Sequence, residues 1–355
     1  MNRNPYSLLF GKEPPQIISR TAQITHVINA FNNDIAPQQV FIITGVRGSG
    51  KTVLMTEIAK KLQKDKTWIT VELNPEKDML EMLGASLSGE NQLAQLFQKA
   101  EINLSFFGFG LSVKGSAPIT NIEVALAKML ETLKKQGKKV LITIDEAINT
   151  KEMRLFASAF QILIRKDLPL YLLMTGLYEN INDLQNEKNL TFLYRAPKVE
   201  LKPLDVRMIA ENYKKNLPVS EETAMQMARI TKGYSFAFQV LGYFAFEQQE
   251  FTNEVINHFR EYLEQYAYEK IWMELSQKDK LLTYGIAKTK SGKIVEIRQY
   301  LEIETNQFNP YRRRLIRKGI IDGSRYGYVY FTLPLFDEYV INMYESEIDD
   351  YHTVI

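Results

Sequence analysis

The sequence predicts an α/β fold: a parallel sheet with helices on both faces, followed by a helical lid and a C-terminal winged-helix domain. In the first part of the chain, short apolar runs rich in β-branched residues alternate with segments of helical periodicity, which is typical of strand–helix–strand units. The pattern then becomes wholly helical and ends in three helices and two short strands around a glycine turn. We therefore expect a core at 1–205, a lid at 206–273, a winged helix at 274–346 and an acidic tail at 347–355.

The composition excludes several classes of protein. The 355 residues are 45% hydrophobic and 24% charged, which argues against a fibrous or disordered chain. Because there is no cysteine, the chain has no disulfide framework, thiol nucleophile, thiolate zinc site or iron–sulfur cluster. The lack of cysteine fits a reducing compartment, and no apolar run is long enough for a signal peptide or a membrane span. We expect a cytoplasmic protein without a membrane partner.

A glycine-rich octet follows the first predicted strand, residues 41–44. It reads Gly-Val-Arg-Gly-Ser-Gly-Lys-Thr at 45–52, which matches the phosphate-binding pattern G-x-x-x-x-G-K-[ST], and a helical pattern follows at 53–62. The alternative is a chance glycine turn, which would require neither the preceding strand nor the following helix. A phosphate site requires both, because it uses backbone N–H groups at the positive end of a helix. Lys51 would bridge the β- and γ-phosphates of ATP, and the Thr52 hydroxyl would bind Mg²⁺. The expected nucleotide contacts are Gly45, Val46, Arg47, Gly48, Ser49, Gly50, Lys51, Thr52 and Val53.

Two adjacent carboxylates end a second buried run, residues 140–144. A parallel sheet would deliver both to its carboxyl edge, where Asp145 would hold Mg²⁺ through a water molecule. Glu146 would orient and deprotonate the water that attacks the γ-phosphate, because side chains at adjacent positions of an extended chain point to different sides. A strand that simply ends in a solvated turn is the alternative.

Three further residues are candidates for contact with the nucleotide. The strand predicted at 169–176 ends at Thr175, which could be a polar sensor of the γ-phosphate or an ordinary strand end. Arg195 begins a last predicted strand within 193–204, and it could face a γ-phosphate in its own site or a neighbour's, or be solvated. The segment that contains Ile18 and Arg20 precedes the first helix and could wrap the adenine.

The remaining core and the lid are assigned from periodicity. A glycine-turned hairpin is expected at 102–113, and its phenylalanines would either pack on the core or form a partner surface. Other predicted core elements are a strand at 66–72 and helices at 78–87, 122–135 and 152–166. The predicted lid helices are 206–217, 221–231, 236–247 and 253–272.

The last domain carries the local basic excess. Residues 276–340 hold 12 Lys and Arg against 7 Asp and Glu. Helices are predicted at 277–287, 293–302 and 309–318, the third with Pro310 at its first position after an Asn309 cap. Double-stranded DNA could bind a basic surface made by the third helix and the wing, whose candidate contacts are Arg312, Arg313, Arg317 and Arg325. Alternatively, this domain packs on its own core or binds protein, with the basic run solvated or paired to the acids at 345–350.

Together these residues resemble a group of bacterial and archaeal AAA-like P-loop ATPases, the archaeal-type group related to STAND and origin-recognition ATPases. The resemblance covers nearly the whole chain. It includes Phe10-Gly11, Pro14-Pro15, Arg20, the octet 45–52, Asp145-Glu146, Thr175-Gly176, the segment 191–195, Gly233-Tyr234 and the C-terminal stretch through 311–316. It implies an ASCE-type P-loop sheet and an ATP hydrolase.

Two departures from that group matter. This chain has Ser19-Arg20 where the group often has Gly-Arg near the adenine, and Gly233-Tyr234-Ser235 where STAND members show Gly-x-Pro in the lid. Because the proline is missing, its nucleotide contact is not carried over to Ser235.

The sequence thus supports three hypotheses. The first is an ATPase that binds Mg²⁺–ATP, hydrolyses it slowly as a conformational switch and couples it to DNA binding. The second is a STAND-like signalling ATPase that binds protein and not DNA, and that self-associates when ATP is bound. The third is a nucleotide-binding module with little turnover.

Overall fold

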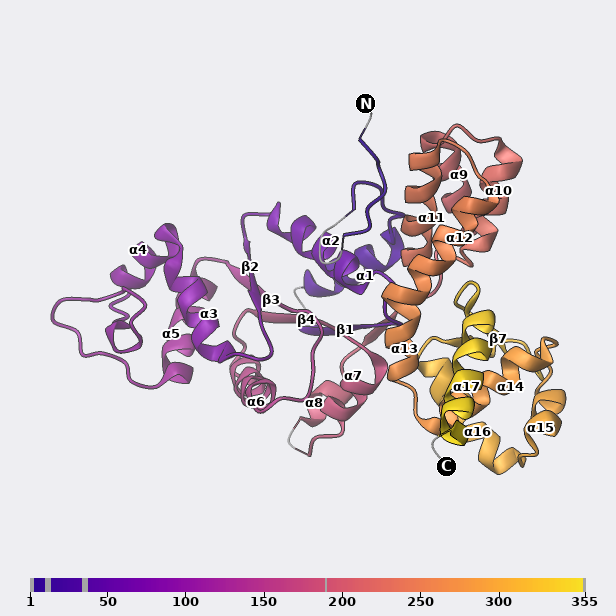
Figure 1. Ribbon diagram of the computed structural model, residues 1–355. Helices are drawn as coiled ribbons and strands as arrows, with labels where there is room; N and C mark the ends of the chain where they lie inside the picture. Colours follow the sequence, from indigo (N-terminus) through magenta and orange to yellow (C-terminus); the bar gives the residue numbers. More distant parts are fainter. Residues whose placement is uncertain (1–2, 10–13, 34–37, 189, 354–355) are drawn as a thin grey trace. The chain divides into compact units, whose positions relative to one another are not determined.

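The computed structural model describes residues 3–9, 14–33, 38–188 and 190–353 (Figure 1). The chain forms two compact units. The sheet unit contains residues 20–44 and 51–200, and the helical unit contains residues 1–19, 45–50 and 201–355. Phe10 and Gly11, which carry part of the family resemblance, lie outside the described residues.

The sheet unit is built on five parallel strands in the order β2-β3-β4-β1-β5. The strands are β1 (Val40–Thr44), β2 (Trp68–Leu73), β3 (Lys139–Ile144), β4 (Leu170–Gly176) and β5 (Lys198–Glu200). All residues of β1 and β4 are buried, as expected for apolar strands covered on both faces. The predicted α/β class with a parallel P-loop sheet is therefore confirmed.

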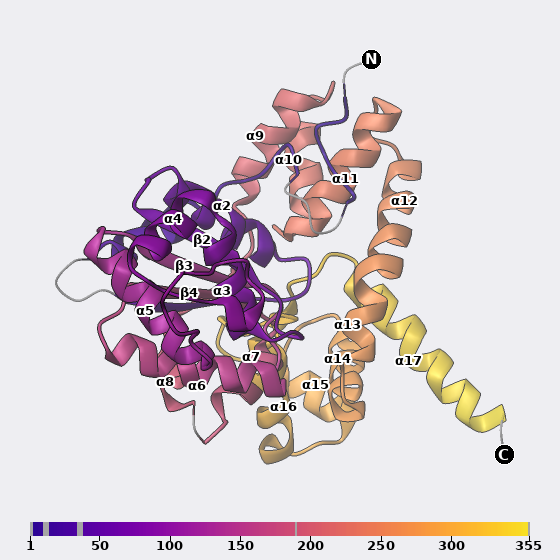
Figure 2. The ribbon, with the colours of Figure 1, turned by 90° about the vertical axis from the view of Figure 1, so that its left-hand side faces the viewer.

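Helices cover both faces of this sheet, with α1 and α2 on one side and α6 and α7 on the other (Figure 1, Figure 2). The unit's helices are α1 (Thr21–Phe31), α2 (Lys51–Gln63), α3 (Met79–Gly89), α4 (Asn91–Lys99), α5 (Ile122–Lys135), α6 (Lys151–Arg165), α7 (Tyr178–Gln185) and α8 (Thr191–Tyr194). Side chains of Asp78, Asn121 and Thr150 accept hydrogen bonds from the first-turn N–H groups of α3, α5 and α6, which explains where these helices begin.

The hairpin expected at 102–113 is wrong. Residues 105–107 form a single 3₁₀ turn, and one backbone bond, from Leu104 N to Leu111 O at 2.9 Å, replaces a strand ladder. Gly108 and Gly110 both have positive φ, so the chain turns twice within three residues. The apolar pattern of this segment arises because Leu104 and Leu111 are buried, at 0% and 2% exposed. Phe106, by contrast, is 62% exposed.

The strand expected within 193–204 is also shorter than predicted. Residues 191–194 form α8, and β5 spans only Lys198–Glu200. Arg195 consequently ends a helical turn instead of beginning a strand.

The helical unit contains the predicted lid helices and a C-terminal group of elements. They are α9 (Val206–Asn216), α10 (Glu221–Ile230), α11 (Ser235–Gln248), α12 (Asn253–Leu263), a π-helical turn (Glu264–Tyr268), α13 (Glu269–Met273), α14 (Gln277–Thr289), α15 (Ile294–Leu301), α16 (Thr305–Arg317), β6 (Ile321–Asp322), β7 (Tyr330–Phe331) and α17 (Phe336–Thr353). The strands β6 and β7 pair antiparallel.

The N-terminal segment packs on the lid. Tyr6 is 2% exposed and its ring stands edge-on to Tyr213 and Phe238. A Cβ at Gly242 would lie 2.6 Å from the Tyr6 ring, so only glycine leaves room for it. This segment therefore belongs to the core of the helical unit.

Two C-terminal helices differ from the prediction. The helix α16 begins at Thr305 because Glu304 and Gln307 form a capping box, so Asn309 is not the cap and Pro310 lies inside the helix. The helix α17 runs through residues 347–353, where a separate acidic tail was expected (Figure 2). Contacts within the unit account for this second difference, because the carboxylate of Glu347 accepts a hydrogen bond from Trp272 Nε1 at 2.7 Å.

None of the helices in the described ranges is both long and apolar enough to cross a membrane.

Candidate nucleotide-binding site

The carboxyl ends of three neighbouring strands meet at one edge of the sheet. The strand β4 lies between β1 and β3, with Thr175 paired to Ile43 and Met174 paired to Ile144. The residue that follows β3, Asp145, is thereby brought beside Thr175. The topology itself assembles the predicted acid and the predicted sensor.

Hydroxyl groups hold both oxygens of the Asp145 carboxylate. Thr52 Oγ1 donates to Oδ2 at 2.8 Å, and the hydroxyl of Thr175, which is 0% exposed, donates to Oδ1. Bonds of this kind to an ionised carboxylate are stronger than neutral ones and fix its orientation. Three residues predicted separately from the sequence, on α2, after β3 and on β4, therefore form one network.

Glu146 joins this network through its backbone. Its backbone N–H donates to Thr175 Oγ1 at 3.1 Å and to Asp145 Oδ1 at 3.2 Å, while its side chain is exposed. Its φ of +51° lies in the left-handed region, which a residue with a Cβ adopts at a cost of about 1 kcal/mol or more. Asp145 is therefore held by two hydroxyl groups, whereas Glu146 lies at a left-handed turn with its side chain exposed.

Lys51 and Thr52 are the first two residues of α2. Lys51 is only 9% exposed, although it is charged, and it lies where the helix presents its positive end. Val53 follows in the same first turn. An anion bound at this helix end would meet both the helix N-terminus and the Lys51 ammonium group.

The octet's first six residues, 45–50, form a loop that joins β1 to α2 and belongs to the helical unit. Gly48 and Gly50 have φ values of +74° and +91°, which explains the requirement for glycine at these positions. Within the loop, Ser49 N donates to Val46 O at 3.1 Å. Arg47 Nη2 forms an ion pair of 2.8 Å with Glu274 Oε1, a contact that the sequence pattern did not predict.

The structure does not bring Arg195 to the edge that carries Asp145. It lines a pocket of about 320 Å³ together with Gln39 and Val40, at the beginning of β1. The Gln39 side chain donates to the carbonyl oxygens of Leu168 and Leu170, at the beginning of β4. This is the amino edge of a parallel sheet, so Arg195 is remote from the phosphate end of its own strands.

The two residues proposed near the adenine belong to different units. Ile18 packs, partly buried, against the core of the helical unit. Arg20 directly precedes α1 in the sheet unit, where burial lowers the pKa of its guanidinium group.

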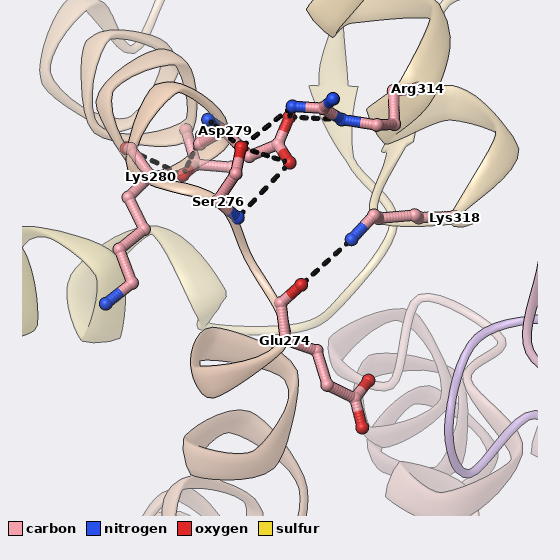
Figure 3. Close-up of polar contacts among 7 residues, drawn as sticks. Glu274, Ser276, Asp279, Lys280, Arg314 and Lys318 are labelled. Atoms are coloured by element: carbon pink, nitrogen blue, oxygen red, sulfur yellow. Dashed lines mark hydrogen bonds and ion pairs between the residues drawn. The ribbon is translucent and has the colours of Figure 1, made fainter. Parts of the chain in front are cut away.

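Only some of the basic side chains on α16 face outward. The guanidinium group of Arg314 donates from Nε and Nη2 to Asp279 Oδ1 at 2.9 and 2.7 Å, and from Nη2 to Ser276 Oγ at 2.8 Å (Figure 3). Arg312 turns inward as well, with Nη2 3.2 Å from Gly323 O. Arg313 and Arg317, four residues apart on one helix face, are exposed.

The turn between β6 and β7 adds a cation and aromatic rings beside α16. The Arg325 guanidinium group lies 4.0 Å from the centre of the Tyr328 ring, which stacks on Tyr330. Tyr326 is 99% exposed. Arg325, Tyr326 and Tyr330 are therefore exposed at this turn.

Two acidic residues of α17, Glu345 and Glu347, form ion pairs with lysines of α14. Glu345 pairs with Lys288, and Glu347 pairs with Lys280 at 2.6 Å, both on α14. The expected pairing of the basic run with the acids at 345–350 is therefore wrong for Glu345 and Glu347, and the side chains of 349 and 350 lie outside the described residues.

Comparisons with known proteins concern the family and the fold of the chain. Residues 20–192 match the model of an ATPase domain found predominantly in Archaea, and residues 265–340 match a domain of unknown function (DUF8462). No curated protein matches the chain. Among solved structures, a Walker-type ATPase of Pyrococcus abyssi is similar with a TM-score of 0.62 at 17% identity, over 92% of this chain and 96% of that one. The ORC2 protein of Aeropyrum pernix is similar with a TM-score of 0.61 at 14% identity, over 97% of each chain.

The two structural likenesses concern the fold, because both identities are low. The family match covers β1, the loop 45–50, α2, β3, β4 and the Asp145 network. On the strength of the family match, the parallel sheet and the strand order, the chain contains an archaeal-type P-loop ATPase domain.

Proposed function

We propose that this protein is a Mg²⁺–ATP-binding ATPase that acts as a nucleotide-controlled conformational switch and binds duplex DNA through α16 and the β6–β7 turn. The observation that carries the ATPase part is the network in which the Thr52 and Thr175 hydroxyls hold the Asp145 carboxylate. The ORC2 structure that this fold resembles is a complex with ADPNP and ADP, which supports nucleotide binding by the same architecture.

The residues present fit a magnesium ion. Mg²⁺ prefers oxygen ligands and keeps several waters, and Thr52 Oγ1 and Asp145 Oδ2 are two oxygens 2.8 Å apart at the start of α2 and the end of β3. The ion would neutralise charge on the phosphate oxygens. Thr52 would bind it directly, and Asp145, held by Thr175, would bind it through water.

The other side chains of the site would each have a separate role in the reaction. The Lys51 ammonium group would contact the β- and γ-phosphates, and the N–H groups of the loop and of α2 would bind the phosphate oxygens. Glu146 would accept the proton of the attacking water, because its side chain is exposed directly after Asp145, where water can reach it. Thr175 would keep Asp145 and the Glu146 backbone in place.

The DNA-binding part rests on the outward face of α16. Arg313 and Arg317 share this face, and Arg325 extends it beside the Tyr328 ring. Arg312 and Arg314 turn inward, to Gly323 O and to the Asp279 carboxylate, so they do not belong to this outward face. The order of α14, α15 and α16, followed by the antiparallel pair β6 and β7, fits a winged helix. In that motif the third helix lies in the major groove of DNA.

Changing Arg313 and Arg317 together to Glu is expected to abolish salt-sensitive DNA binding. Fluorescence anisotropy of a random-sequence duplex would be measured without nucleotide, with ADP and with a non-hydrolysable ATP analogue. If about four phosphates are contacted, log K should fall against log[salt] with a slope near −3.6. The matched control changes Arg207 and Arg229, exposed on α9 and α10, to Glu. Equal losses in both variants, or no binding at low salt in any nucleotide state, would contradict DNA binding and favour a protein-binding switch.

Arg195→Ala tests action on a neighbouring molecule. Because Arg195 lies at the amino edge of its own sheet, it would reach a γ-phosphate in another copy of the chain. We expect its loss to lower ATPase activity only at protein concentrations at which molecules associate, measured as specific activity across a dilution series. Arg165→Ala, at the exposed end of α6, is the control. A loss that is independent of concentration would reject this role.

A further inference from the structure

Three successive lid residues donate hydrogen bonds to three successive carbonyl oxygens of the loop 45–50. Tyr234 Oη donates to Arg47 O at 2.7 Å, and Ser235 Oγ donates to Ser49 O at 2.9 Å. Between them, the Phe236 N–H donates to Gly48 O at 3.1 Å. All of these residues lie within the helical unit.

On the side of the lid, this contact is made by the beginning of helix α11. Because α11 begins at Ser235, the N–H of Phe236 is one of the first-turn donors that have no partner inside their own helix. The loop carbonyl of Gly48 satisfies it. One backbone bond and two side-chain bonds therefore join the beginning of α11 to the loop.

Tyr234 is held tightly at the loop. It is 4% exposed, and burial raises the pKa of its hydroxyl well above the usual value, so the hydroxyl remains a proton donor at neutral pH. A Cβ at Gly48 would lie 2.3 Å from Tyr234 Oη. The glycine at 48 is thus required both by its positive φ and by the space that Tyr234 occupies.

Because the peptide bond is planar, the bonds to the loop's carbonyl oxygens also fix the direction of its backbone N–H groups. In a trans peptide the C=O of one residue and the N–H of the next point in opposite directions. When the lid holds the carbonyls of Arg47 and Ser49, it turns the N–H groups of Gly48 and Gly50 away from the lid. Those two N–H groups belong to the set that a glycine-rich phosphate loop presents to its ligand.

We propose that Tyr234 and Ser235 are positioning residues for phosphate binding: the lid sets the affinity for ATP by orienting the loop's backbone, without touching the nucleotide. This inference rests on the proposed ATP-binding function. It also assigns a role to the Gly233-Tyr234-Ser235 segment, which lacks the proline of the related lids.

The decisive variant is Tyr234→Phe, which removes one hydroxyl and leaves the ring beside Gly48. Loss of one hydroxyl-to-carbonyl bond corresponds to about a fivefold change in an equilibrium constant. We expect the Kd for a fluorescent ATP analogue, and the KM for ATP, to rise about fivefold while kcat stays within about twofold. Ser235→Ala is expected to act in the same direction, and Ser235→Thr, which keeps the hydroxyl, is expected to restore the affinity.

The same unit offers a matched control. The hydroxyl of Tyr213, in the same lid, donates to the carbonyl oxygen of Phe238 at 2.8 Å and is fully buried. Tyr213→Phe removes the same kind of bond without reaching the loop, so it should lower the thermal unfolding midpoint as Tyr234→Phe does and leave the Kd unchanged.

The outcomes separate this inference from the proposed function. If the wild-type protein binds the ATP analogue and Tyr234→Phe and Ser235→Ala bind it as tightly as Tyr213→Phe, the positioning role is wrong and ATP binding stands. If the wild-type protein does not bind the analogue, the proposed function itself fails.

Discussion

Lys51→Ala is expected to abolish ATP binding at concentrations that saturate the wild-type protein. Lys51 is 9% exposed at the first position of α2, directly after the glycine loop. Charge-assisted bonds to phosphate contribute about 1.5–3 kcal/mol each, so losing contacts to two phosphates should weaken binding by at least about 100-fold. Titration of a fluorescent ATP analogue measures this directly.

The control for this experiment lies on the same helix. Lys61, in the last turn of α2, is exposed, and Lys61→Ala should leave the Kd unchanged. Circular dichroism and the unfolding midpoint establish that both variants fold. A Lys51→Ala protein that binds the analogue within about threefold of the wild type would overturn the assignment of the loop 45–50 and α2 as the phosphate site.

Glu146→Gln is expected to keep ATP binding and to remove turnover. An amide of the same shape cannot accept the proton of the attacking water, and loss of a general base typically lowers kcat by about 10²–10⁴-fold. The contacts that place this residue are made by its backbone N–H with Thr175 and Asp145, so the substitution should leave them intact. Phosphate release under saturating ATP gives kcat, and the analogue titration gives the Kd.

Glu131→Gln, an exposed position on α5, supplies the matched control and should turn over ATP at the wild-type rate. If Glu146→Gln hydrolyses ATP at more than about a tenth of the wild-type rate, Glu146 is not the base. If it fails to bind the analogue, its side chain has a structural role that the backbone contacts do not show.

The strands, the glycine loop and several helices of the sheet unit could be predicted because each depends on residues that are close together in the sequence. Buried parallel strands read as continuous apolar runs, and the octet at 45–52 matches its pattern at every defined position. The helices that begin after Asp78, Asn121 and Thr150 carry their capping residues in the sequence. Thr52, Asp145 and Thr175 were each predicted separately from such signals, and the structure places them in one network.

The errors occurred where contacts distant in sequence decide the conformation. Residues 102–113 have the alternation and glycines of a hairpin, but burial of Leu104 and Leu111 in the core and the two left-handed glycines produce a loop. The basic run at 312–317 could not be divided from the sequence into inward and outward members. Arg314 points inward because it donates hydrogen bonds to the buried carboxylate of Asp279, 35 residues earlier in the chain.

The sequence by itself determined the α/β class, the phosphate loop and the acids after β3, because each depends on neighbouring residues and on the periodicity of a single element. Only the tertiary structure decided that Arg195 lies at the amino edge of the sheet and that Tyr234 and Ser235 hold the loop at 47–49. The reason is physical. Strand order and the packing of α11 bring together groups more than a hundred residues apart, and no local pattern encodes which distant carbonyl a buried hydroxyl will meet.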